Sequence, residues 1–70
     1  ILVCCMVETE EAVANADAIA AVLGVDALMI GTSDLTATMG IAGEIGHARV
    51  RAAYAAVAEA CRRHGKALGM

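Results

Sequence analysis

Two short apolar runs constrain the fold of this chain more than any other feature of its sequence. Residues 1–7 read ILVCCMV, and residues 25–30 read VDALMI. A membrane span needs about 20 apolar residues, so neither run is long enough to cross a bilayer. Apolarity that is continuous rather than alternating is typical of strands buried on both faces, as in a parallel sheet covered by helices. We therefore predict a buried parallel strand at each run, and a third strand that begins near Ala67.

The segment after the first run carries the signals of a helix. Thr9 is a suitable N-cap, and Glu10 and Glu11 then fall in the first turn, where carboxylates interact favourably with the helix dipole. An Ala-rich helix is predicted over residues 12–22, and Gly24 is expected to end it. Its expected apolar face consists of Val13, Ala16, Ile19 or Ala20, and Leu23.

A second, longer helix is predicted over residues 48–64, with Gly65 as its stop. The order strand–helix–strand–turn–helix–strand predicts an α/β fold with parallel strands. Three such strands leave sheet edges unpaired, and a (β/α)₈ TIM barrel of about 250 residues would supply the others. We expect both ends of the chain to be cuts, so that residues 1–70 form part of one such domain. The apolar face of the second helix is expected to consist of Val50, Tyr54, Val57 and Cys61.

Composition and charge narrow the possible function classes. Only 19% of the residues are charged and 60% are hydrophobic, which excludes intrinsic disorder. Five Lys and Arg residues against eight Asp and Glu give a net charge of −3, which argues against a nucleic-acid partner. The first run has neither a basic n-region nor a cleavage site, so we expect no signal peptide and no membrane partner. Irregular spacing indicates buried thiols in a reducing cytoplasm for the three cysteines, Cys4, Cys5 and Cys61.

Two acidic residues follow the two strands at equivalent places. Glu8 comes directly after the first run, and Asp34 lies just past the second, after a small turn. Parallel strands end at one edge of the sheet, where α/β proteins place their sites, and neighbouring strands are about 4.8 Å apart. Two carboxylates there could both reach one Mg²⁺ or Mn²⁺ ion. Oxygen ligands suit these two ions better than they suit zinc. The alternative is that both acids only favour helix N-termini and hold no ligand.

The turn at residues 31–34 also has two interpretations. Gly31 lets the backbone approach a ligand closely, and the N–H groups that open a helical turn bind anions, so a carboxylate or phosphate could lie there. Alternatively, Ser33 or Asp34 simply caps a helical turn over residues 35–39.

Other residues whose side chains could take part in catalysis or metal binding have structural explanations. His47 is expected near a helix cap, and His64 ends a helix, where a histidine interacts favourably with the dipole. The basic residues of the last helix are expected on a solvated face. Core filling is expected of the four methionines, Met6, Met29, Met39 and Met70.

Two stretches of this sequence resemble the HpcH/HpaI aldolases, the metal-dependent class II pyruvate aldolases. The first is Val7-Glu8-Thr9, and the second is the stretch VDALMIGTSDL over residues 25–35. The likeness extends through residues 39–41 and 47–50 to Gly65-Lys66, so it covers essentially the whole chain. It implies a (β/α)₈ barrel, of which this chain would hold roughly the fifth strand to the start of the seventh.

The resemblance also implies a set of site residues. Glu8 and Asp34 match the two carboxylate metal ligands, and Ser33 matches the position whose backbone N–H meets the substrate carboxylate, with Gly31 in the same turn. The implied cofactor is a divalent cation, Mg²⁺, Mn²⁺ or Co²⁺, which acts as a Lewis acid and stabilises an enolate. The general-base His and an Arg would come from earlier strands, so no catalytic residue is expected within this segment. Met6 stands where family members often carry a substrate-contacting Gln, which leaves the substrate open.

The function implied is that of a cytoplasmic lyase. The full-length enzyme would reversibly cleave a 4-hydroxy-2-oxo acid to pyruvate and an aldehyde, and it would be a homo-oligomer. Residues 1–70 alone would be inactive. Two alternatives remain: a citrate-lyase-like CoA-ester lyase of the same superfamily, and a truncated, non-catalytic segment that only packs against partner chains.

Overall fold

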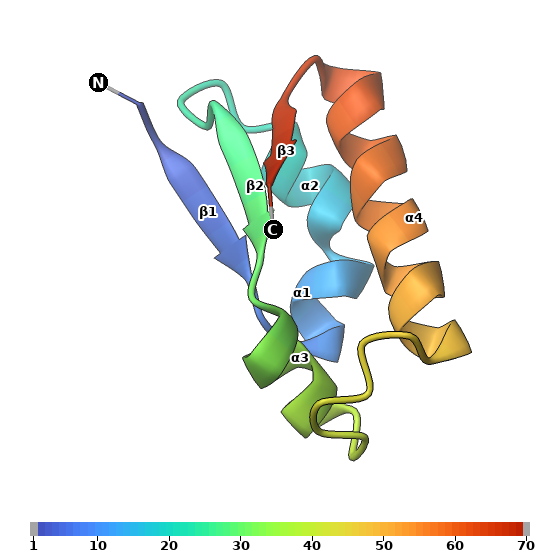
Figure 1. Cartoon of the computed structure of the whole chain (residues 1–70). Helices are drawn as coiled ribbons and strands as arrows, with labels where there is room; N and C mark the ends of the chain where they lie inside the picture. Colours follow the sequence, from blue (N-terminus) through green and yellow to red (C-terminus); the bar gives the residue numbers. More distant parts are fainter. Residues whose placement is uncertain (1, 70) are drawn as a thin grey trace.

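Three parallel strands form one sheet in the structure, a computed structural model that describes residues 2–69. The strands are β1 (Cys4–Val7), β2 (Ala27–Ile30) and β3 (Ala67–Gly69), and they lie in this order across the sheet (Figure 1). Both neighbouring pairs are parallel, with Val7 opposite Ile30 in the first pair. The predicted α/β class with parallel strands is confirmed. The core role expected of Met70 falls outside the described residues.

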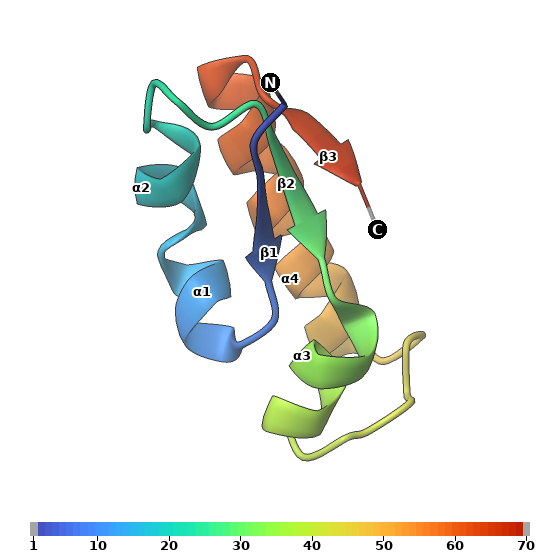
Figure 2. The same cartoon turned by 90° about the vertical axis from the view of Figure 1, so that its left-hand side faces the viewer.

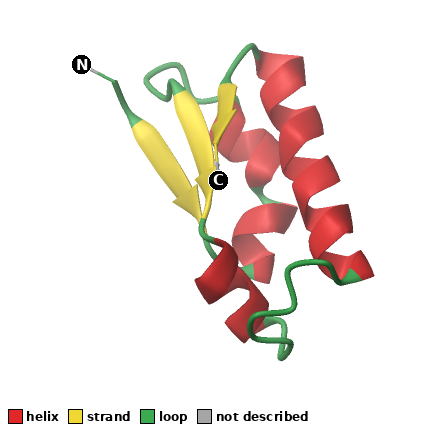
Figure 3. Ribbon diagram, in the orientation of Figure 1, coloured by secondary structure: helices red, strands yellow, loops and turns green. Residues whose placement is uncertain are grey.

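Helices cover one face of this sheet and one of its ends. In the described part of the chain they are α1 (Glu10–Ala14), α2 (Ala16–Ala20), α3 (Thr32–Thr38) and α4 (Ala48–His64). Figures 1 and 3 show α1, α2 and α4 beside one face, whereas α3 lies beyond the carboxyl ends of β1 and β2. Among residues 2–69, no helix has the length and apolarity needed to cross a membrane.

The first helical segment begins as predicted but is shorter and interrupted. Thr9 is the N-cap, and its Oγ1 accepts a hydrogen bond of 3.0 Å from the Ala12 N–H. A single helix over residues 12–22 was the wrong prediction, because Asn15, with φ −96° and ψ 7°, separates α1 from α2, which ends at Ala20. Leu23 was expected on the apolar face, but it lies beyond α2 in the loop to β2 and is 98% exposed.

The long helix α4 is confirmed at both ends. The His47 imidazole accepts a hydrogen bond of 3.0 Å from the Arg49 N–H, so His47 is the N-cap. Gly65 ends the helix in a left-handed conformation with φ 68°, which a residue without Cβ adopts readily. The predicted apolar face is also confirmed: Val50, Val57 and Cys61 are buried, and Tyr54 is half-buried against the core.

The two faces of the sheet have very different surroundings. Val7, Leu28 and Ile30 point toward the helices and form the core with the buried alanines of α2 and α4. Met6 belongs to the other face and is 53% exposed, and Cys4 is exposed as well. The expectation of strands buried on both faces therefore does not hold, because the described helices cover only one face. For the same reason, Met6 does not fill the core and Cys4 is not a buried thiol.

Leu28 offers a direct test of this core. It lies in the central strand and is fully buried, so Leu28→Ala is expected to lower the free energy of unfolding by about 2–5 kcal/mol. Leu23→Ala removes the same atoms from a side chain that is 98% exposed, and it should change stability by no more than about 0.5 kcal/mol. Denaturant unfolding of the two variants in the full-length protein measures the difference. Equal effects would contradict the burial of Leu28 in this core.

Candidate metal and substrate site

The candidate site lies where β1 and β2 end and α1 and α3 begin (Figure 2). α3 begins at Thr32, directly after the strand, and its N-cap is Gly31, which has no side chain to bond the helix. The prediction that Ser33 or Asp34 caps a turn over residues 35–39 is therefore wrong. Both residues lie inside the first turn of α3, and both are exposed.

Glu8 is half-buried and lies directly against Gly31. A Cβ atom placed on Gly31 would be 2.8 Å from Glu8 Cγ and 3.3 Å from Glu8 Oε1. The Glu8 carboxylate thus reaches from the end of β1 to the residue that precedes α3. Asp34 stands in the first turn of that helix. The structure therefore places the two predicted ligands at the same end of the sheet, on neighbouring β-to-α connections.

Both carboxylates are without a charged partner within residues 2–69. The ion pairs of the described residues involve other acids, namely Glu10, Asp17 and Glu59. Neither Glu8 nor Asp34 caps a helix through its side chain, since Thr9 and Gly31 occupy the cap positions. In the same range, no group of three or more His, Cys, Asp and Glu side chains is arranged to hold a metal. The donor set available is two carboxylates, which suits Mg²⁺ or Mn²⁺ when water and substrate oxygens complete the coordination.

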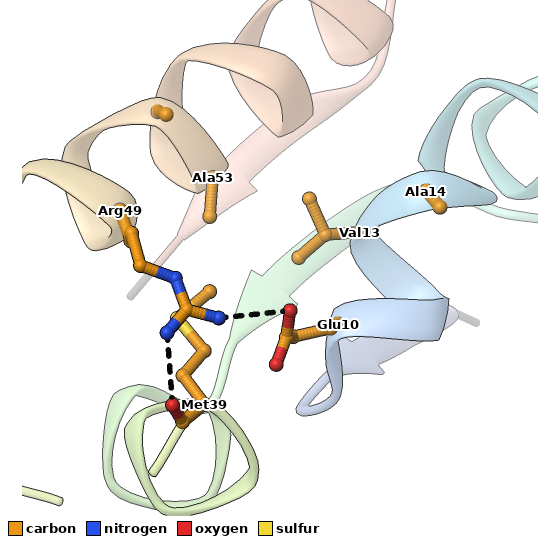
Figure 4. Close-up of a pocket in the computed structure, with 7 residues that line it drawn as sticks. Glu10, Val13, Ala14, Met39, Arg49 and Ala53 are labelled. Atoms are coloured by element: carbon orange, nitrogen blue, oxygen red, sulfur yellow. Dashed lines mark hydrogen bonds and ion pairs between the residues drawn. The ribbon is translucent and has the colours of Figure 1, made fainter. Parts of the chain in front are cut away.

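Two contacts from α4 hold α3 in place. The Tyr54 hydroxyl lies 3.1 Å from Thr32 Oγ1, at the first residue of α3. Arg49 donates to the Met39 carbonyl oxygen at the other end, over 3.0 Å, and pairs with Glu10 of α1 over 3.1 Å (Figure 4). The sequence pattern predicts core packing for Tyr54 and a solvated position for Arg49. No local pattern could have revealed these roles, because each partner is distant in the sequence.

A cavity of about 320 Å³ lies between α1 and α4, beside the Arg49–Glu10 pair (Figure 4). Its walls are mostly alanine and other apolar side chains. It lies among the helices, whereas Glu8 and Asp34 follow the strand ends. We assign no part of the candidate site to it.

Two further sequence candidates have structural roles. Burial raises the pKa of the Cys61 thiol, so the thiol stays neutral. Its Sγ atom is a weak hydrogen-bond donor that lies 3.6 Å from the Ala67 carbonyl oxygen. His64 Nε2 lies 3.1 Å from Asp17 Oδ1 and joins the end of α4 to α2. Cys61 is thus a buried thiol, as predicted, and His64 ends α4, as predicted. The contact of His64 with Asp17 was not predicted, because the two residues are distant in the sequence.

Parallel strands followed by helices define an α/β chain. Its candidate site, two carboxylates without charged partners among residues 2–69, lies at the strand ends, which is the usual position of a site in that class. Comparison with known proteins gives the family. The HpcH/HpaI aldolase/citrate lyase family model matches residues 1–70, and the chain belongs to this family.

Individual relatives agree with this assignment. The chain is 52% identical over 65 residues to a 4-hydroxy-4-methyl-2-oxoglutarate aldolase of Hapsidospora irregularis, covering 93% of the chain and 24% of that protein. It is 48% identical over 69 residues to a hydroxypyruvate/pyruvate aldolase of Pseudomonas aeruginosa, covering 96% and 26%. A crystal structure of a family protein from Burkholderia cenocepacia J2315 matches with a TM-score of 0.94 and 39% identity, over 99% of this chain and 27% of that one. The chain thus spans about a quarter of the length of these relatives.

Proposed function

We propose that this chain is part of a metal-dependent aldolase that reversibly cleaves a 4-hydroxy-2-oxo acid to pyruvate and an aldehyde. The observation that carries the proposal is the position of Glu8, whose carboxylate reaches the residue that precedes α3, while Asp34 lies in the first turn of that helix. Two unpaired acids at neighbouring strand ends, in a chain of this family, fit one divalent cation better than two separate helix-terminus roles.

The proposed roles divide between metal and substrate. Glu8 and Asp34 would hold the cation, and the Ser33 N–H in the first turn of α3 would orient the carboxylate of the 2-oxo acid, with Gly31 in the same turn. When bound, a divalent cation supplies Lewis-acid polarisation of the keto group. The general base and an Arg are expected from parts of the barrel outside these residues, and the chain's own contribution is to bind and orient.

Names of the relatives indicate the substrates to try first. Pyruvate release by the full-length protein is the direct assay, followed through a lactate dehydrogenase coupling. 4-Hydroxy-4-methyl-2-oxoglutarate would give two molecules of pyruvate, because its C4 carries a methyl group, whereas a 4-hydroxy-2-oxo acid with a hydrogen at C4 would give one pyruvate and an aldehyde. We expect turnover with Mn²⁺ or Mg²⁺, its loss after chelation, and its recovery when the ion is returned. Chelation that leaves turnover unchanged would contradict the metal dependence.

A CoA-ester lyase is the second candidate, because the family model also describes citrate lyases. The same preparation should be offered a hydroxyacyl-CoA ester such as citryl-CoA. Cleavage of the ester without cleavage of the oxo acid would favour this candidate over the aldolase. A chain that bound no metal and cleaved neither substrate would instead fit a non-catalytic packing segment.

The assembly and location proposed follow from the same resemblance. We propose a homo-oligomer in the cytoplasm, and the three free cysteines agree with a reducing compartment. Light scattering of the purified full-length protein measures the oligomeric state, and a monomer at micromolar concentration would contradict it.

A further inference from the structure

We infer that Gly31 is a positioning residue for Glu8: it is glycine because the Glu8 side chain fills the space that a side chain at position 31 would need. The inference rests on the proposed function, in which Glu8 holds the cation. It assigns Gly31 a role separate from substrate contact, because the lack of a side chain at Gly31 would determine where the Glu8 carboxylate can lie.

The contact is too close for any substituent. A Cβ on Gly31 would lie 2.8 Å from Glu8 Cγ, 3.3 Å from Oε1 and 3.4 Å from Cδ. The nearest atom is the Cγ methylene in the middle of the side chain, so a small rotation of the carboxylate alone does not relieve the overlap. The rest of the Glu8 side chain has to move to a different rotamer.

The backbone at this position does not itself require glycine. Gly31 has φ −83° and ψ 86°, values that an L-residue adopts. Gly40, Gly43 and Gly65 differ, since their φ values of 75°, 81° and 68° lie in the left-handed region. Among these four glycines, Gly31 alone combines an ordinary conformation with an occupied Cβ position. Space is therefore the reason for glycine here.

Neither backbone is free to move apart. The Gly31 N–H donates to the Val7 carbonyl oxygen over 3.0 Å, and the Gly31 carbonyl oxygen accepts from the Leu35 N–H over 2.9 Å. Leu35 is fully buried. On the other side, Glu8 is flanked by the buried Val7 and by Thr9, which caps α1. Because both backbone segments are fixed, a methyl group added at position 31 displaces the Glu8 side chain.

A change of rotamer at Glu8 would move its carboxylate oxygens, and a metal ligand tolerates little movement. Metal–oxygen distances in a working site hold to within about 0.2 Å, and partners that orient ligands cost about 10–100-fold in metal affinity when they are changed. We therefore expect Gly31→Ala to weaken Mn²⁺ binding by the full-length protein about 10–100-fold. Gly24→Ala is the matched control, because no atom lies within 4 Å of its Cβ position, and it should leave the affinity unchanged.

The binding test is a cycle with Glu8→Gln, measured by Mn²⁺ titration in the absence of substrate. Gly31→Ala should weaken binding in the wild-type background and add nothing in the Glu8→Gln background, since the ligand is already lost there. A further loss of the same size in that background would overturn the inference, because Gly31 would then act independently of Glu8. An unchanged affinity in Gly31→Ala would overturn it too.

A stability cycle tests the contact without any metal. Glu8→Gln keeps the Cγ atom, whereas Glu8→Ala removes it. Gly31→Ala should lower the melting temperature by about 2–5 °C in the wild-type and Glu8→Gln backgrounds, and by no measurable amount in the Glu8→Ala background. An equal fall in all three backgrounds would overturn the steric contact.

The two cycles separate failure of the inference from failure of the proposed function. If Glu8→Gln leaves Mn²⁺ affinity unchanged, Glu8 is not a ligand, and both the proposed metal site and the positioning role are overturned even when the stability cycle shows coupling. If Glu8→Gln abolishes binding while Gly31→Ala does not weaken it, only the positioning role is overturned.

Discussion

Glu8→Gln and Asp34→Asn are each expected to weaken Mn²⁺ binding by the full-length protein at least about 100-fold, and to lower aldolase activity in parallel. A change of this size corresponds to about 2.8 kcal/mol, at about 1.4 kcal/mol for each factor of ten. The reason is that each variant replaces an anionic oxygen donor by a neutral amide of nearly the same shape. With two protein carboxylates proposed to hold the ion, loss of either removes half of the negative charge that attracts it.

The control is a nearby acid that is exposed, as Asp34 is, but does not lie at the strand ends. Glu11 lies in the first turn of α1 and is exposed, so Glu11→Gln makes the same change of charge close to Glu8. It should leave both Mn²⁺ affinity and turnover unchanged. Isothermal titration with Mn²⁺ and the pyruvate-release assay are measured on the same samples. Full activity in Glu8→Gln or in Asp34→Asn would rule that residue out as a ligand.

Local signals account for the part of the fold that sequence could predict. β1 and β2 follow from short apolar runs, and α4 follows from the spacing of its apolar residues and its glycine stop. Thr9 could be assigned as a cap because its hydroxyl bonds the backbone only three residues away. Each of these features depends on residues that are close together in the sequence, so the sequence alone indicates it.

The features that sequence could not predict depend on tertiary contacts. α3 begins at Thr32 rather than at Leu35. Its first turn is held by the buried face of the helix and by the contact between Thr32 and the Tyr54 hydroxyl. The Glu8–Gly31 contact requires the register in which Val7 stands opposite Ile30. Polar sequence around residues 31–34 is compatible with a plain turn, and only the sheet brings it beside Glu8. The residue types at the candidate site were therefore predictable, but the tertiary contacts that position these residues were not.

Residues 1–70 expressed alone are expected to be inactive and poorly soluble. β1 and β3 are both edges of the sheet, so each leaves backbone N–H and C=O groups without strand partners on one side. Apolar side chains are also uncovered, with Leu2 73% and Met6 53% exposed. A surface of this kind favours association between copies. Activity is not expected in any case, because the proposed base and Arg lie outside this segment.

Size-exclusion chromatography and the pyruvate-release assay test this expectation against the full-length protein under the same conditions. Co-expression with the remainder of the barrel is the decisive comparison, because strands that pair with β1 and β3 would bury both edges and the face that carries Met6. We expect solubility and turnover to return together in the co-expressed pair. A soluble, monomeric 70-residue chain that releases pyruvate by itself would mean that the uncovered face is a stable surface, and that catalysis needs none of the residues we expect from the other strands.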